Sequence, residues 1–472
     1  MPASERSRAE RLRSSYQAAG QGQVFTFWES LDERERSELL DDLEGVNTAE
    51  LSALSAMAAS TDHRHPTAEI EPAEVVSWQD VSNETIELGR QALAKGSVAA
   101  LTVAGGQGTR LGLDGPKGAL PISPVRGKTL FQLFAEFIAA TDRRYGCATT
   151  WYVMTSPAND AQTRAFFAAN QYFGLSSERI RFFKQGVMPA FDPGGKILLD
   201  QPHRLALSPD GHGGTLLALA HGGMLADMVA RGVEQISYFQ VDNPLVACLD
   251  PAFIGLHVSA GAEMSSKSVP KADDLEKVGN FVRVNGKAAV IEYSDLPPTL
   301  GHAKNPDGTR RFNAANIAVH LLSRRFVERL TENPASFALP WHRAEKKVPY
   351  MDLSSGRRVH PERPNAIKLE SFIFDALPLA NRTVTLETSR EEEFSPVKNP
   401  TGVDSIETAQ RDMSRRAARW MASAGYAIPR RADGEPDGRF EISPLVALDA
   451  TQLTEQPRPA RSISAGESVY LG

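Results

Sequence analysis

The chain of 472 residues exceeds the size at which a single hydrophobic core stops growing, so its length predicts two or three domains. Its composition, 41% hydrophobic and 23% charged, is ordinary for a soluble globular protein. The net charge of −6, from 52 basic and 58 acidic side chains, argues against a general nucleic-acid-binding protein, so any affinity for phosphate has to be local.

The sequence also lacks the marks of a membrane or secreted protein. No apolar run reaches 18 residues, and the first residues, MPASERSRAERLR, contain no apolar core of a signal peptide. Only Cys147 and Cys248 occur, so neither a disulfide framework nor a zinc cluster is expected, which is consistent with a reducing compartment. We therefore expect a cytoplasmic protein with no membrane partner.

Residues 1 to about 60 are predicted to be helical, because Leu39, Leu40 and Leu43 continue an apolar face at helical spacing. The stretch Asp62 to Pro66 contains an H-x-H pair that resembles a metal site. It lies in a polar, proline-ended linker with no third ligand nearby, and we interpret it as a loop. The helical region is taken to extend to residue 95.

From residue 96 the pattern changes to apolar strands that alternate with amphipathic helices. Strands are predicted at residues 98–104, 150–155, 181–184, 235–241, 263–269, 280–284 and 288–293. The last two should form a hairpin around Asn285-Gly286. This alternation predicts an α/β fold with a Rossmann-like central sheet, mixed but mostly parallel, flanked by helices. We assign residues 96–395 to this domain and 396–472 to a small C-terminal domain.

Two helices adjoin the loops that carry chemistry. One begins at Leu130, where Thr129 and Gln132 have the spacing of a capping box. The other is predicted from Thr215 to about Val229, directly after the glycine-rich turn at residues 209–214. The N-terminus of this second helix would direct N–H groups at whatever the turn holds.

The most informative stretch follows the first strand, where four glycines fall within Gly105 to Gly112. Glycine lets a ligand approach the backbone closely, so its N–H groups can converge on an anion, and Arg110 and Lys117 add two cations. A polyphosphate is the ligand that this arrangement favours. The loop is not a Rossmann fingerprint, because Gly112 comes one position late, and it is not a P-loop, because Ile122 stands where that motif needs glycine.

A second chemical position is Asp242, which follows the strand at residues 235–241. An acidic residue at the carboxyl end of a central strand is where an α/β fold builds its site. We predict that Asp242 binds magnesium, because that ion prefers hard oxygen ligands and substrate phosphates. A turn or capping aspartate is the alternative.

These loops resemble those of one family. The resemblance to the eukaryotic-type UDP-N-acetylglucosamine pyrophosphorylases, within the wider group of UDP-glucose and UDP-sugar pyrophosphorylases, covers almost the whole chain. It is carried by AGGQGTRLG, PKG, TLFQ, WYVMTS, PDGHGG, VDN, EYS, FNAAN, KKVPY, IKLESFIFD, REEEFSPVKN and EISPLV. It implies the fold of the nucleotide-diphospho-sugar transferases.

The resemblance also implies a role for each matching position. Nucleotide contacts are expected from Ala104, Gly105, Gly106, Gln107, Gln185, Gly211, Asp242 and Lys368, with Gln185 and Gly211 at the uracil. The catalytic cations would be Arg110 and Lys117 at the phosphates of UTP and Lys398 at the sugar phosphate. Sugar contacts are expected from His212, Glu292, Tyr293 and Asn316. Asp242 would hold Mg²⁺, the expected cofactor.

Two departures from the family pattern leave the sugar open. The N-acetylglucosamine enzymes usually carry Gly-Asn-Gly-Gly, whereas this chain has His212 at the second position, as the UDP-glucose and UDP-sugar relatives do. The usual Asn-Ala-Gly-Asn has Ala315 at its third position. The expected product is UDP-N-acetylglucosamine, and the alternatives are UDP-glucose or several UDP-sugars. A non-catalytic nucleotide-sugar sensor is a remote alternative.

The implied reaction joins UTP to a hexose 1-phosphate and releases pyrophosphate. The sugar phosphate is already an anionic nucleophile, so no general base is needed. Catalysis should depend on positioning and electrostatic stabilisation of an in-line displacement. The expected partners are UTP and a sugar 1-phosphate, without nucleic acid, and the oligomeric state stays open.

Overall fold

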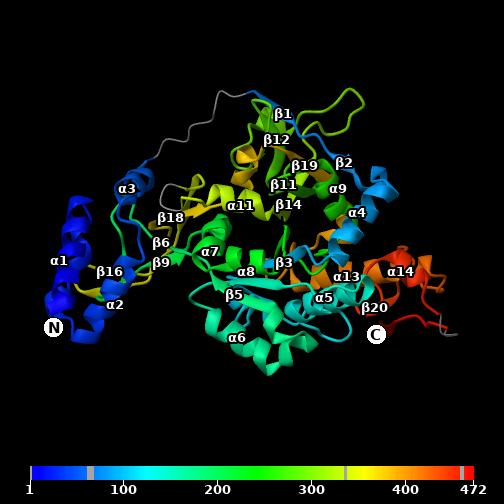
Figure 1. Cartoon of the computed structure of the whole chain (residues 1–472), viewed down its shortest axis with the longest axis horizontal. Helices are drawn as coiled ribbons and strands as arrows, with labels where there is room; N and C mark the ends of the chain where they lie inside the picture. Colours follow the sequence, from blue (N-terminus) through cyan, green and yellow to red (C-terminus); the bar gives the residue numbers. More distant parts are fainter. Residues whose placement is uncertain (1–2, 61–68, 334–336, 458–461) are drawn as a thin grey trace. The chain divides into compact units, whose positions relative to one another are not determined.

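The computed structural model describes residues 3–60, 69–333, 337–457 and 462–472 (Figure 1). The chain forms two compact units, each built from segments that are far apart in the sequence. Unit 1 comprises Met1–Pro66, Gln185–Thr215 and Ala338–Asp375, and unit 2 comprises Thr67–Lys184, Leu216–Phe337 and Ala376–Gly472. The predicted loop at Asp62–Pro66 lies outside the described residues, and the division into three successive domains stays a prediction.

Unit 2 contains the large central sheet. Its main strands lie in the order β2 (Val76–Ser77), β19 (Thr383–Glu387), β11 (Met264–Pro270), β14 (Ala314–Ser323), β10 (Gln235–Gln240), β3 (Val98–Val103), β4 (Trp151–Thr155) and β5 (Ile180–Lys184). β14 is antiparallel to β10 and β11, and the other neighbouring pairs are parallel. The predicted mixed, mostly parallel α/β sheet is therefore confirmed.

A small extension branches from this sheet. β12 (Asn280–Val284) pairs with β1 (Ile70–Pro72), β13 (Lys287–Ile291) and β14. Asn285 and Gly286 both have positive φ, +49° and +78°, as the predicted hairpin requires. The observed bounds of β11 and β13 differ from the predicted ones by one or two residues, as element ends commonly do.

Helices complete unit 2. They are α4 (Asn83–Ala94), α5 (Leu130–Tyr145), α6 (Asp160–Ala169), α7 (Thr215–His221), α8 (Met224–Ala230), α9 (Pro251–Ala260), α10 (Pro298–Gly301), α11 (Arg324–Leu330), α12 (Arg390–Glu393), α13 (Ile406–Ser423) and α14 (Ala450–Thr454). The single helix predicted from Thr215 to Val229 is wrong. Gly223 has a φ of +72°, which an α-helix cannot accommodate, and the chain divides there into α7 and α8.

The predicted capping box of α5 is only half formed. The side chain of Thr129 accepts a hydrogen bond from the Gln132 N–H at 3.2 Å, as an N-cap residue does. The Gln132 side chain instead donates to Glu136 Oε1 at 3.0 Å. The apolar face of α5 is buried: Phe131 packs against Trp151 of β4, and Phe134 packs against Phe239 of β10. These two aromatic contacts join α5 to β4 and β10 of the sheet.

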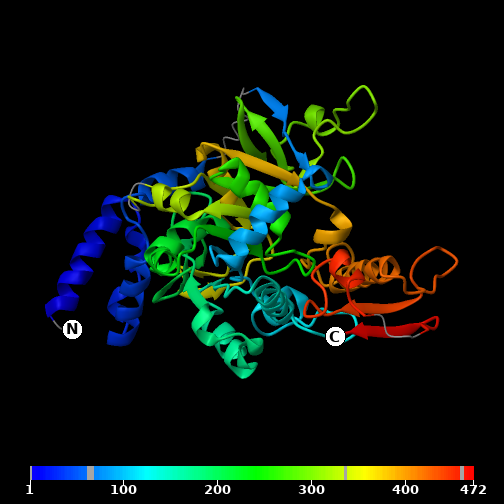
Figure 2. The same ribbon diagram turned by 45° about the vertical axis from the view of Figure 1, so that its right-hand side comes forward.

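The C-terminal part of unit 2 gathers around α13, as Figure 2 shows. Its strands are β20 (Gly438–Ile442) and β21 (Glu467–Leu471), which pair in parallel. Glu441 of β20 accepts hydrogen bonds from the N–H groups of Val125 and Arg126, each at 2.8 Å. This segment therefore fastens the loop that precedes α5.

Unit 1 combines helices with short strand pairs. Its helices are α1 (Ala3–Ala18), α2 (Glu33–Glu44) and α3 (Leu51–Ala59), which confirms the predicted helical N-terminus. Its strand pairs are β6 (Val187–Pro189) with β9 (Leu207–Pro209), β7 (Leu199–Gln201) with β8 (Arg204–Leu205), β15 (Trp341–Lys346) with β18 (Ala366–Ser371), and β16 (Tyr350–Asp352) with β17 (Arg357–Val359). Leu39, Leu40, Leu43, Phe191 and Leu369 belong to one buried cluster. In the described ranges, no helix has the length and apolar character needed to span a membrane.

Candidate active site

The glycine-rich loop and Asp242 meet at one edge of the sheet. β3 and β10 are parallel neighbours, with Val103 opposite Gln240, so the segments that follow both strands emerge side by side. The loop begins at Ala104, which is buried, and folds back so that the Lys117 N–H donates to the Gly106 carbonyl at 3.1 Å. The glycine-rich loop and Asp242 therefore lie together at the carboxyl ends of central strands, where the sequence predicts the site.

A buried asparagine that the sequence analysis missed holds this loop. Asn159 is 0% exposed, and its Nδ2 donates to the carbonyls of Ala104 at 2.8 Å and Gly106 at 3.2 Å. Its Oδ1 accepts the Ser156 N–H at 2.9 Å. Asn159 thus fixes the direction of the Ala104 and Gly106 carbonyls.

The predicted phosphate cation and the predicted metal ligand are in contact. Lys117 Nζ lies 3.2 Å from Asp242 Oδ2, and the two side chains are only 16% and 13% exposed. Arg110, in contrast, is exposed and makes no ion pair with any residue that the structure describes. The half-enclosed ion pair offers a polyphosphate one cation, Lys117, and the exposed Arg110 of the same loop segment supplies a second.

Lys398 is brought to the same edge by backbone hydrogen bonds. The Val397 N–H donates to the Asp242 carbonyl at 2.9 Å. Asn243 lies beside this bond; its Nδ2 donates to the Glu393 carbonyl at 2.7 Å, and its Oδ1 accepts the Ser395 N–H at 3.2 Å. Asn243 therefore fastens the turn after β10 to the segment that presents Lys398.

A buried charge cluster also holds the segment that leads from Glu393 to Lys398. Lys267 of β11 is 0% exposed and contacts Glu393 at 2.6 Å and Asp250 at 2.7 Å. Burial alone would lower the pKa of Lys267, but the two carboxylates outweigh it and raise that pKa. The cluster is structural, because both carboxylates are occupied by Lys267.

Asp404 closes the loop that follows Lys398. Its carbonyl accepts the N–H groups of Lys398 and Asn399 at 2.7 and 2.9 Å, and its φ is +55°. Burial raises the pKa of the Asp404 carboxyl, while Lys398 lowers it and Asp242 raises it further. Asp404 therefore lies within electrostatic reach of both predicted site residues.

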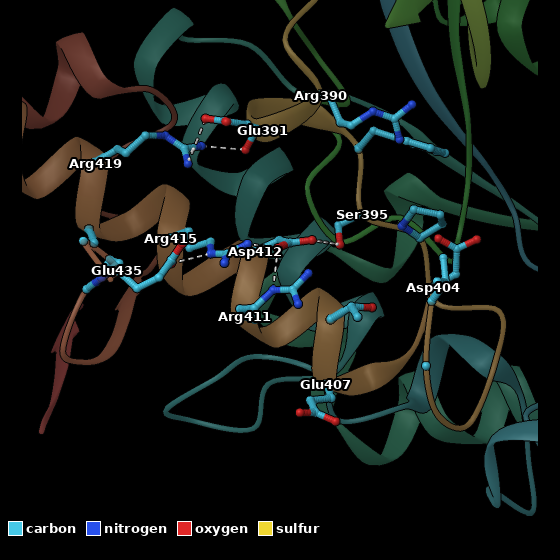
Figure 3. A pocket seen from close by; sticks show the side chains of 18 of the residues that line it. Arg390, Glu391, Ser395, Asp404, Glu407, Arg411, Asp412, Arg415, Arg419 and Glu435 are labelled. Atoms are coloured by element: carbon cyan, nitrogen blue, oxygen red, sulfur yellow. Dashed lines mark hydrogen bonds and ion pairs between the residues drawn. The ribbon is translucent and has the colours of Figure 1, made fainter. Parts of the chain in front are cut away.

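A large cavity beside the 390–404 segment is not the predicted site. It has a volume of about 900 Å³, lies between α13 and the 390–404 segment, and contains none of the predicted site residues (Figure 3). Its charges pair with one another: Arg415 contacts Glu435 at 2.7 Å, and Arg419 contacts Glu391 at 3.2 Å. With five arginines and five carboxylates in its lining, it offers an anion no net attraction.

The predicted sugar residues of unit 2 form a second group around Gly279. A Cβ at Gly279 would come 3.0 Å from Glu292 Oε1 and 3.7 Å from the Asn316 Cβ, so both side chains border this glycine. Tyr293 is 48% exposed. Ala315, which departs from the family pattern, is fully buried in the core of the sheet. Its methyl group therefore contributes to packing.

Unit 1 holds the predicted uracil residues. Gln185 Nε2 donates to Asp210 Oδ1 at 3.3 Å and to the Gly211 carbonyl at 3.4 Å. Gly211 has a φ of +87°, and a Cβ there would meet the Ser371 carbonyl at 2.3 Å. Close packing therefore requires glycine at this position of the turn. The Gly214 N–H was expected to point at a ligand, but it donates to the Gly211 carbonyl at 3.2 Å.

Asp210 is a second residue that the sequence analysis missed. Its carboxylate lies under Gly186 and Gly214, where added Cβ atoms would approach within 2.4 and 2.3 Å. Burial raises the pKa of Asp210 to about 6, although the bond from Gln185 opposes this.

The other two predicted residues of unit 1 are His212 and Lys368. His212 Nδ1 accepts the Ile373 N–H at 3.2 Å, and its ring stacks on Phe372. Lys368 lines a cavity of about 640 Å³ together with Lys347, which has no ion pair among the described residues. A cavity with these two lysines suits a phosphate-bearing ligand.

The site and the fold define a class of protein. A glycine-rich loop after β3 and an aspartate after β10 that contacts the Lys117 ammonium group, on a mixed sheet, are features of a sugar nucleotidyltransferase. Residues 52–417 match the family model described as UTP--glucose-1-phosphate uridylyltransferase, and the chain belongs to this family.

The names of similar proteins agree with this family assignment. The chain is 37% identical to "UDP-N-acetylglucosamine pyrophosphorylase" of Saccharomyces cerevisiae, over 87% of this chain and 90% of the relative. It is 36% identical to "UDP-N-acetylhexosamine pyrophosphorylase-like protein 1" of Xenopus tropicalis, over 93% and 92%. Among solved structures, the uridine diphosphate N-acetylglucosamine pyrophosphorylase of Trypanosoma brucei has a TM-score of 0.82 and 26% identity, with 98% of each chain covered.

Proposed function

We propose that this protein transfers the uridylyl group of UTP to N-acetylglucosamine 1-phosphate, forming UDP-N-acetylglucosamine and pyrophosphate. The observation that carries the proposal is the Lys117–Asp242 pair beside the glycine-rich loop. The names of the yeast and Xenopus relatives support the same reaction and the same sugar class.

The reaction needs charge compensation and alignment. Lys117 and Arg110 bind the phosphates of UTP, and Lys398 binds the phosphate of the sugar, so that two polyanions meet despite their repulsion. The sugar phosphate attacks the α-phosphorus, and pyrophosphate leaves with its negative charge stabilised by the same cations. Because the nucleophile is already ionised, no side chain has to remove a proton.

Magnesium fits this site as a partner of the substrate. Among the described residues, no three or more His, Cys, Asp or Glu side chains group into a metal cage. One carboxylate, Asp242, with phosphate oxygens and waters is an arrangement that Mg²⁺ accepts. When bound, the ion supplies neutralisation of phosphate charge. Asp242 would hold the ion, and Lys117 beside it would bind a phosphate oxygen of UTP.

The remaining residues provide selectivity. Gln185 and Gly211 read the uracil, Ala104 to Gln107 support the nucleotide, and Lys368 contacts the nucleotide side of the substrate. Glu292, Tyr293, Asn316 and His212 contact the sugar. The cytoplasmic location stays a prediction.

A second candidate is a UDP-glucose or broad UDP-sugar pyrophosphorylase, which His212 favours. The test is pyrophosphate release with UTP and Mg²⁺ from the 1-phosphates of N-acetylglucosamine, N-acetylgalactosamine, glucose and galactose. A preference for the N-acetylated pair is the expected result. A preference for glucose or galactose would establish the second candidate, and no release with any sugar would contradict both.

A further inference from the structure

Lys398 depends on its backbone for its position. The residue is exposed, and its side chain makes no ion pair with any residue in the described ranges. The Lys398 N–H donates to the Asp404 carbonyl at 2.7 Å, and the Val397 N–H donates to the Asp242 carbonyl at 2.9 Å. Whatever holds this segment therefore determines where the ammonium group can meet a phosphate.

Ser395, three residues before Lys398, is a buried anchor of this segment. It is 5% exposed, and its N–H donates to Asn243 Oδ1 at 3.2 Å. Its hydroxyl donates to Asp412 Oδ2 at 2.9 Å (Figure 3). A hydrogen bond to an ionised carboxylate is stronger than one between neutral groups. Ser395 thus joins the segment to the turn after β10 through its backbone and to α13 through its side chain.

Two arginines orient the Asp412 carboxylate. Its Oδ1 accepts hydrogen bonds from Arg411 Nε at 3.1 Å and from Arg415 NH1 at 3.4 Å, while its Oδ2 accepts the Ser395 hydroxyl. Arg415 is held in turn by Glu435 at 2.7 Å. The Asp412 side chain is 28% exposed, so its removal leaves no closed cavity in the core.

The helix that carries Asp412 is itself fixed to the site. Arg416 lies one turn after Asp412 on the same face of α13. Its NH1 donates to the carbonyls of Leu245 and Glu392, each at 2.8 Å. Leu245 belongs to the turn that follows Asp242, so α13 is tied both to that turn and to the segment that leads to Ser395.

We propose that Asp412 is a positioning residue that holds Lys398 at the phosphate of the sugar substrate, acting through Ser395. This rests on the proposed function, in which Lys398 binds that phosphate. Asp412 fixes the Ser395 hydroxyl, Ser395 fixes the backbone before Lys398, and the turn closed by Asp404 presents the ammonium group. The C-terminal helix α13 thereby takes part in aligning the sugar phosphate without touching it.

The effect of losing this anchor should be confined to the sugar phosphate. In the proposed reaction the phosphate of the sugar becomes the β-phosphate of the UDP-sugar. The Kd for UDP-N-acetylglucosamine therefore reports the position of Lys398 even in a variant that has no turnover. The phosphates of UTP are assigned to Lys117 and Arg110, so the Kd for UTP should stay unchanged.

The experiment is titration calorimetry of the full-length protein with UDP-N-acetylglucosamine and with UTP. We expect Asp412→Ala and Ser395→Ala each to raise the Kd for UDP-N-acetylglucosamine about tenfold, because small displacements of a positioned group are costly. Asp412→Asn should keep most of the affinity, because its amide oxygen still accepts the Ser395 hydroxyl. Glu407→Ala, which removes an exposed carboxylate of the same helix, is the control and should bind both ligands as the wild type does.

A second comparison shows whether Asp412 acts through Lys398. Lys398→Ala should itself weaken UDP-N-acetylglucosamine binding, and adding Asp412→Ala to it should cause no further loss. A residue with a merely structural role would lower the affinity equally in both backgrounds. If Asp412→Ala does not fold, Ser395→Ala in the wild-type and Lys398→Ala backgrounds makes the same comparison.

The outcomes separate the two levels of the account. Wild-type binding by Asp412→Ala, equal increases in the two Kd values, or a full further loss in the double variant contradicts the inference and leaves the uridylyl transfer intact. Unchanged binding in Lys398→Ala also contradicts it. A wild type that forms no UDP-sugar from UTP and any sugar 1-phosphate contradicts the proposed function and the inference with it.

Discussion

Lys117 Nζ and Asp242 Oδ2 lie 3.2 Å apart, although 125 residues separate them in the sequence. The contact exists because β3 and β10 are parallel neighbours, so the loops after both strands leave the same edge of the sheet. Lys117 is the residue expected to bind the phosphates of UTP, and Asp242 is the residue expected to bind magnesium. Most of the chemistry proposed above depends on this contact.

Replacing Lys117 by alanine removes one preorganised cation from the triphosphate. We expect kcat to fall at least about a hundredfold, the usual scale for one such group. Steady-state pyrophosphate release with saturating UTP measures it. Lys95→Ala, at an exposed lysine paired with Glu234 on the surface, is the matched control and should retain full activity. Near-normal turnover in Lys117→Ala would remove Lys117 from the catalytic set.

Asn243 should act through Lys398. Asn243→Ala leaves the Glu393 carbonyl and the Ser395 N–H without their side-chain partner, so the segment leading to Lys398 loses its attachment to the turn after β10. We expect the KM for the sugar 1-phosphate to rise about tenfold with little change in the KM for UTP. Equal increases in both KM values would show that the whole site is disturbed.

Gly211 should tolerate no side chain. Gly211→Ala combines a φ of +87° with a Cβ 2.3 Å from the Ser371 carbonyl, so the turn that carries His212 has to move. Gly223→Ala is the matched control, because φ is +72° there but the space is open. We expect the melting temperature to fall in both variants and the KM for UTP to rise several-fold only in Gly211→Ala. An unchanged KM in Gly211→Ala would argue against a nucleotide contact at this turn.

Asp210 should make stability depend on pH. The pKa of Asp210 is about 6 in the folded protein and about 3.9 in the unfolded chain. The protonated carboxyl therefore makes its full contribution to the free energy of unfolding below about pH 4, and this contribution is lost as the pH rises through 6. A difference of about two pKa units corresponds to about 3 kcal/mol. Asp210→Asn stays neutral and keeps the acceptor for Gln185.

Denaturant unfolding of the wild type and Asp210→Asn between pH 4 and pH 7 checks this. The variant should gain stability relative to the wild type as the pH rises, whereas Asp80→Asn, at an exposed aspartate, should show no such trend. Parallel curves for the wild type and Asp210→Asn would mean that the Asp210 carboxyl is ionised in the folded protein without penalty.

The sequence was most informative where a pattern is local. The turn at Asn285-Gly286 is predicted correctly and the strand Asn280–Val284 has its predicted bounds, because turn residues and alternating strands are short-range signals. Local reasoning also found the glycine-rich loop and Asp242. It overlooked that Gly222-Gly223 would divide the helix after Thr215.

The residues that sequence reasoning missed act over long distances along the chain. Asn159 holds carbonyls more than 50 positions earlier, and Asn243 holds a segment 150 positions later. Asn159 belongs to none of the motifs quoted above, and although Asn243 is the last residue of the VDN motif, its role could not be predicted, because the partners of both side chains are backbone groups that any residue could supply. The division into two units could not be predicted from local patterns either, because the segments of the two units alternate along the sequence.

The central claim is uridylyl transfer to a sugar phosphate, and product stoichiometry tests it most directly. The purified full-length protein is incubated with UTP, Mg²⁺ and N-acetylglucosamine 1-phosphate, and UDP-N-acetylglucosamine and pyrophosphate are quantified together. The account predicts equal amounts of both products and neither product when the sugar phosphate is omitted. Pyrophosphate without the UDP-sugar, or its release from UTP alone, would contradict it.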